Sequence, residues 1–184
     1  MLMKRNKWAC RVLLNLLVWP LACSAFGSDL EIAGSARFKE QVIQALALLN
    51  KDAPEAYAIV IKFVGRIVQG DKSGMWAYKN PPTYEMSDHT AFHSVTWCAG
   101  SIAHDSFHSK LYHEYKEKHP GRVPADIWTG VEAEKKCLKH QQDVLKKIKA
   151  PKHEIDIFLK LDGTHHDINK DGKYDREDYR KRDW

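Results

Sequence analysis

Residues 91–108 read Ala91-Phe-His-Ser-Val-Thr-Trp-Cys-Ala-Gly-Ser-Ile-Ala-His-Asp-Ser-Phe-His108. Most side chains before His104 are apolar or small, which predicts a helix that is buried over much of its surface. His104 and His108 stand four positions apart, so they share one helix face and lie one turn from each other. Two imidazoles in this arrangement can bind one metal ion, and zinc is a common partner of buried histidines.

The rest of the chain carries further helical patterns. Apolar residues recur every three or four positions in several segments, and Pro and Gly separate them. We expect helices at 38–50, 55–69, 90 or 92 to 118, 126 or 129 to 148, and 154–161. Residues 70–88 have a loop-like composition, and neither a strand nor an internal repeat is predicted. The expected fold class is mainly α: a compact helical domain with a metal-bearing helix pair and a C-terminal EF-hand-type loop.

A third metal ligand is expected from the segment 126–148. Glu134 belongs to a stripe with spacings of 4, 3, 4 and 3, formed by Glu134, Leu138, Gln141, Leu145 and Ile148. A carboxylate on a stripe that faces the core needs a compensating charge, which a metal would provide. Glu132 is the alternative ligand, but it lies about 200° around the helix and is expected in solvent.

With these residues, the segment 91–148 resembles zinc metallopeptidases of the gluzincin group, related in pattern to thermolysin. Those enzymes carry His-Glu-x-x-His on one helix and a glutamate ligand on a later helix. The resemblance implies that His104, His108 and Glu134 bind zinc and that a peptide or protein is the substrate. Asp105 stands where the group has its catalytic Glu. An Asp general base is one methylene shorter, and a displacement of about 1 Å can cost about a hundredfold in rate. The sequence is therefore compatible with an active zinc hydrolase and with a non-catalytic metal-binding protein.

Two interpretations of the histidine pair need no metal. His104 and His108 can be hydrogen-bonded core residues, or Asp105 can orient one of them.

Cys98 and Cys137 lie close in sequence to the ligands on the two helices. If the helices pair, these cysteines are candidates for a disulfide that joins them, and two buried free thiols are the alternative.

The C-terminal region, 162–184, contains a twelve-residue pattern of the EF-hand type. An EF-hand loop places oxygen ligands at positions 1, 3, 5, 7, 9 and 12 and a glycine at position 6. The corresponding residues are Asp167, Asn169, Asp171, Lys173 through its backbone carbonyl, Asp175 and Asp178, with Gly172 at position 6. The pattern predicts a bound calcium ion.

Position 12 of this loop is Asp178 instead of the bidentate Glu of sensor EF-hands. In this respect the loop resembles those of dockerin modules. A dockerin has two such loops and the sequence shows one, so binding to a cohesin partner does not carry over. We expect this calcium loop to stabilise the C-terminal segment instead of acting as a sensor.

Residues 1–27 have the three parts of a secretory signal peptide: a basic start, an apolar run and small residues at the end. The run is too short to span a membrane comfortably, although an uncleaved anchor and a lipoprotein at Cys23 are alternatives. The chain has 184 residues and a net charge of +5, of which four positive charges belong to this segment. The remaining charge of +1 gives no reason to expect nucleic-acid binding. We expect an exported protein, periplasmic or secreted, with a domain at 28–161.

Overall fold

The computed structural model describes residues 30–172 and 174–181. The expected signal peptide and Lys173 lie outside the described residues. The described chain is broadly helical and also contains a small sheet. In chain order its elements are β1 (Glu31–Ala33), α1 (Ala36–Asp52), α2 (Pro54–Phe63), β2 (Arg66–Gly70), β3 (Gly74–Trp76), β4 (Thr83–Ser87), α3 (Asp88–Phe92), α4 (Val95–Lys118), α5 (Ala125–Trp128), α6 (Val131–Lys147), α7 (Lys152–Phe158) and α8 (Arg176–Lys181).

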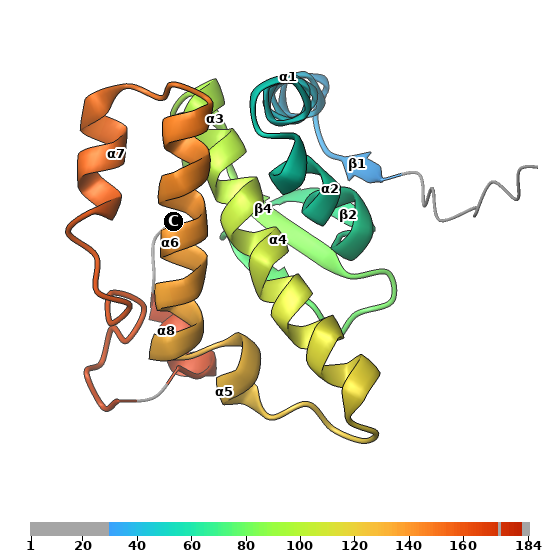
Figure 1. The fold of residues 1–184 in the computed structure, drawn as a ribbon, viewed down its shortest axis with the longest axis vertical. Helices are drawn as coiled ribbons and strands as arrows, with labels where there is room; N and C mark the ends of the chain where they lie inside the picture. The colour runs from blue at the N-terminus through green and yellow to red at the C-terminus, as the bar shows by residue number, and fades with distance from the viewer. Residues whose placement is uncertain (1–29, 173, 182–184) are drawn as a thin grey trace, which may run out of the picture.

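Helix α4 is the centre of the arrangement (Figure 1). Helices α1 and α2 pack against it on one side and α6 on the other, while α7 covers the outer side of α6. The start of α4 is capped by Ser94, whose hydroxyl accepts a hydrogen bond from the Trp97 amide at 2.8 Å. The buried Glu154 of α7 accepts 2.7 Å hydrogen bonds from the hydroxyls of Ser94 and Thr96. These bonds connect α7 to the beginning of the central helix.

The four-stranded sheet was not predicted from the sequence. Its order is β1-β2-β4-β3, with β1, β2 and β4 parallel and β3 antiparallel at the edge. The predicted helix 55–69 was too long, because α2 ends at Phe63 and Val64 is already extended. A side chain at Gly65 would lie 2.5 Å from Pro81, so the close approach of the β4 segment needs glycine here. Tertiary pairing with β4 therefore overrides the helical spacing.

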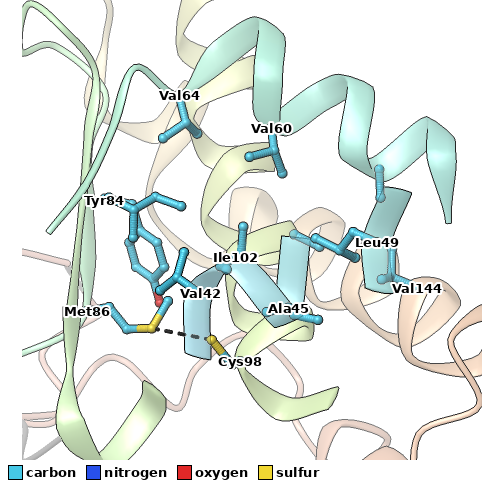
Figure 2. Close-up of a cluster of buried hydrophobic side chains, with 14 of the residues drawn as sticks. Val42, Ala45, Leu49, Val60, Val64, Tyr84, Met86, Cys98, Ile102 and Val144 are labelled. Carbon is cyan, nitrogen blue, oxygen red and sulfur yellow. Dashed lines mark hydrogen bonds between the residues drawn. The ribbon is translucent and has the colours of Figure 1, made fainter. Parts of the chain in front are cut away.

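The hydrophobic core lies where α1, α2, α4 and the sheet meet. Figure 2 shows side chains from these elements gathered around Ile102, with Met86 of β4 facing Cys98 of α4. Strand β4 buries Tyr84 and Met86, which alternate with the less buried Glu85. Among the described residues, we find no helix with the length and apolar content needed to cross a membrane.

Candidate metal centre

Helix α4 presents both predicted imidazoles at the end of its buried stretch. His104 and His108 are 8 % and 6 % exposed. Their Nε2 atoms lie 3.0 Å apart. The two rings thus point their metal-binding nitrogens at the same place, as residues one turn apart on a helix can.

Helix α6 brings Glu134 to that place. Its carboxylate is 3 % exposed, with Oε1 at 3.1 Å from His108 Nε2 and Oε2 at 3.3 Å from His104 Nε2. The approach of the two helices depends on Gly100, because a Cβ there would lie 2.8 Å from Leu145 of α6. A glycine one turn before His104 therefore allows the carboxylate to reach the imidazoles.

The three side chains have dimensions that suit zinc. In a tetrahedral site, ligand atoms at about 2.0–2.2 Å from zinc are about 3.4 Å from each other. The separations between His104, His108 and Glu134 are 3.0, 3.1 and 3.3 Å, so small outward shifts would admit an ion. Glu134 Oε2 is within ion-pair distance of His104 but is not aligned for a hydrogen bond, and it is buried without one. A buried carboxylate oxygen without a hydrogen-bond donor is stabilised by a nearby cation.

A backbone carbonyl orients one of the imidazoles. The Nδ1 atom of His108 lies 2.6 Å from the Trp128 carbonyl oxygen, at the end of α5. Because a carbonyl only accepts, Nδ1 carries the proton and Nε2 is the available ligand in the neutral ring. This is the arrangement that commonly fixes the tautomer of a metal-binding histidine.

Charges at the centre shift the pKa values of its members in opposite directions. Burial lowers the pKa of His108, whereas the adjacent Cys137 and Glu134 raise it, and it lies well above its ordinary value. Burial raises the pKa of Glu134, but His108 and His166 outweigh that effect and hold it well below its ordinary value. Without metal, the centre is therefore an ionised carboxylate beside a protonated imidazole.

Asp105 lies in a cleft that opens beside the metal centre. The cleft has a volume of about 660 Å³, and its walls include Trp76, Asp105, His108, Trp128, Glu134 and His166. Asp105 is half-buried there. Its charge adds to burial in raising the pKa of Tyr84 well above the ordinary value, so this phenol stays protonated. The residue predicted as a general base thus shares a cavity with two of the predicted ligands.

Three further donors near the centre, Cys137, His165 and His166, were not predicted as ligands. His166 Nδ1 lies 3.2 Å from Glu134 Oε1. The ligand atoms of His104, His108 and Cys137 all lie within 4.8 Å of one another, as do those of Glu134, His165 and His166. The spacing of Cys137 three residues after Glu134 is a signal for a shared helix face. No local pattern could place His166, because its position depends on how the C-terminal segment folds back.

The predicted disulfide between Cys98 and Cys137 is wrong, because both cysteines are free and buried. Cys98 faces the core, with its sulfur 3.8 Å from Met86 Sδ, whereas Cys137 faces the imidazoles. Cys98 and His104 are six residues apart, which is about 240° around the helix, so they point to different sides of α4. The alternative ligand Glu132 is exposed and pairs with Lys135 at 2.7 Å.

In the described part of the predicted calcium loop, backbone amides donate to the first and last aspartates. Asp167 accepts hydrogen bonds from the amides of Asp171 and Gly172, and Gly172 has the positive φ of 81° that favours glycine. The buried Asp178 accepts from the amides of Ile168, Asn169 and Asp175. Burial raises the pKa of Asp178, but these amides outweigh it and the pKa is lowered. In the described part of the loop, no three carboxylates lie within 4.8 Å of one another. Calcium binding stays a prediction.

No family model, no curated protein and no solved structure matches this chain. The resemblance to gluzincins and to dockerin loops therefore rests on the motifs alone.

Proposed function

We propose that this protein is a zinc-dependent hydrolase of peptide bonds, with zinc held by His104, His108 and Glu134. The observation that carries the proposal is the convergence of these three buried side chains on one point, at separations of 3.0 to 3.3 Å. Bound zinc would supply Lewis acidity to a carbonyl in the cleft.

Asp105 is the proposed general base. It follows the first ligand on α4 and lines the same cleft as His108 and Glu134. In this role its carboxylate accepts a proton from the attacking water. Strand β3 lies at the edge of the described sheet, and Trp76 of this strand lines the cleft. An extended peptide can add to such an edge through main-chain hydrogen bonds, which supports a peptide as the substrate.

The first test is the zinc content of the protein purified without chelator. We expect one zinc ion per chain, lost in His104→Ala and in Glu134→Ala but kept in Glu132→Ala, whose side chain points to solvent. Cys137→Ser tests whether the thiol contributes as well, and we expect it to keep the metal. Absence of zinc from the wild-type protein would reject the proposal.

A peptide-library assay then tests catalysis in the zinc-loaded protein. We expect cleavage by the wild type and background rates in Asp105→Ala. Equal background rates in both would leave the second candidate function, a non-catalytic metal-binding protein with a structural or interaction role. His166 and Cys137 favour that alternative, because additional protein donors beside a metal are typical of closed structural sites.

We also propose that the loop Asp167–Asp178 binds calcium and stabilises the C-terminal segment. The support is the complete set of oxygen donors at the ligand positions, together with the positive φ of Gly172 at the sharp turn.

A further inference from the structure

His166 connects the calcium loop to the metal centre. It directly precedes Asp167, the first residue of the loop, and its Nδ1 lies 3.2 Å from Glu134 Oε1 on α6. Its side chain is 20 % exposed. The residue that immediately precedes the loop thus contacts a predicted zinc ligand.

The loop itself holds the His166 ring in place. Tyr174, at position 8 of the loop, stacks on the ring of His166 at 5.8 Å between centroids and 29° between planes. The Tyr174 hydroxyl donates to the Gly163 carbonyl, on the other side of His166 in sequence. His165 lies against the same ring, at 4.0 Å between centroids. His166 is therefore in direct contact with Tyr174, a residue of the loop itself.

The C-terminal helix α8 contacts residues in and next to strand β3. Lys72, which precedes β3, donates to the backbone carbonyls of Tyr179 at 3.3 Å and of Arg180. The Tyr179 ring packs edge-on against Trp76, with centroids 5.2 Å apart. The described parts of the segment 163–181 thus contact α6 through His166, and Lys72 and the Trp76 ring through α8.

We propose that His166 is a positioning residue: its Nδ1–H donates to Glu134, directs the carboxylate toward His104 and His108, and makes zinc affinity depend on the calcium loop. The inference rests on the proposed zinc and calcium sites. Hydrogen bonds from such partners orient carboxylate ligands, and their loss typically weakens metal binding by about 10- to 100-fold. Calcium that closes the loop strengthens zinc binding through the same contact, and by linkage zinc strengthens calcium binding by the same factor.

Zinc dissociation constants measured by competition with a chromophoric chelator test the positioning role. We expect His166→Ala to weaken zinc binding by about 10- to 100-fold. His166→Asn should recover most of this loss, because its side-chain amide can place a donor near the position of Nδ1. His153→Ala is the matched control, since His153 is exposed on α7, and it should bind zinc as the wild type does. Equal affinity in wild type and His166→Ala, or failure of Asn to improve on Ala, overturns the inference.

The calcium arm uses calcium-free buffer prepared on resin, because soluble calcium chelators also bind zinc. We expect added calcium to tighten zinc binding in the wild type and to change it little in His166→Ala. An equal calcium response in both proteins contradicts the coupling. Tyr174→Phe, which removes only the hydroxyl that reaches Gly163, should reduce the coupling without removing a ring, and it serves if His166→Ala fails to fold.

These outcomes separate this inference from the proposed function. If the wild type and His153→Ala bind no zinc, the proposed function fails. If both bind zinc and His166→Ala binds it equally well, the zinc site stands and the positioning role alone is rejected.

Discussion

The Nε2 atoms of His104 and His108 face each other at 3.0 Å, while Nδ1 of His108 is engaged by a backbone carbonyl. Two facing lone pairs at this distance would repel, so without metal one of the two Nε2 atoms carries a proton and donates to the other. The same geometry therefore accommodates a proton without metal and an ion with it.

Zinc binding should release a proton near neutral pH. The pKa of His108 is raised well above its ordinary value, so the metal-free centre is protonated at pH 7 and zinc must displace that proton. Affinity should consequently rise by about tenfold per pH unit for one displaced proton, up to the raised pKa. Calorimetry in two buffers of different ionisation enthalpy measures the release. The calcium titration is the control, because the loop offers no imidazole at its ligand positions. Zinc binding without proton release would contradict the prediction.

Lengthening Asp105 should improve catalysis. Asp105→Glu restores the methylene that the gluzincin motif has, and we expect an increase of up to about a hundredfold in the rate of peptide cleavage. Asp105→Asn, which keeps the shape of aspartate but cannot accept the proton as a base, should be inactive. Both variants must be compared at equal zinc content. Rates that fall in Asp105→Glu would show that the cleft is built around the shorter side chain.

Gly100 should control the distance between the two metal-bearing helices. Gly100→Val places a Cβ 2.8 Å from Leu145 Cδ2, and overpacking of this kind costs about 1–3 kcal/mol of unfolding free energy. Zinc affinity should fall as well, because α6 carries Glu134. Urea unfolding measures the first effect and chelator competition the second. The double variant with Leu145→Ala supplies space, and it should recover zinc affinity even though removal of a core leucine has its own cost.

Calcium should stabilise the protein through the loop. A ligand at a hundred times its dissociation constant adds about 2.7 kcal/mol to the unfolding free energy. We expect this increase in the wild type and its loss in Asp167→Ala, which removes the first ligand. Asp156→Ala is the control, because this aspartate pairs with Lys152 on α7, away from the loop. A calcium effect that survives in Asp167→Ala would place the ion elsewhere.

Periodicity predicted much of the helical part of the fold. The segment 38–50 corresponds to α1, and the central and fourth helices correspond to α4 and α6 with shifted starts. The sheet was missed for two different reasons. Val64 and Ile67 continue the helical spacing of α2, and only contact with the β4 segment decides against it. Strand β4 buries Thr83, Tyr84, Met86 and Ser87 and leaves Glu85 less buried, so it lacks the regular alternation that marks a half-buried strand.

For the candidate site too, helix spacing predicted some residues, whereas contacts that depend on the tertiary fold were missed. His104, Glu134 and their helix faces follow from spacing within single helices. The contact of His166 with Glu134 joins residues 32 positions apart and depends on a turn of the C-terminal segment, so no periodicity encodes it. The misplaced disulfide has a related cause, because proximity of Cys98 and Cys137 to the ligands in sequence does not specify the side of the helix on which each sulfur lies.

Trp128 gives the molecule an optical reporter of its own. Its carbonyl oxygen holds His108, and its indole ring lines the cleft and packs edge-on against Tyr112 and Tyr78. A bound ion that shifts the His108 side chain changes the environment of the Trp128 indole. Zinc uptake should therefore alter the intrinsic emission, and Trp128→Phe, which keeps the carbonyl, should remove that signal without removing the metal.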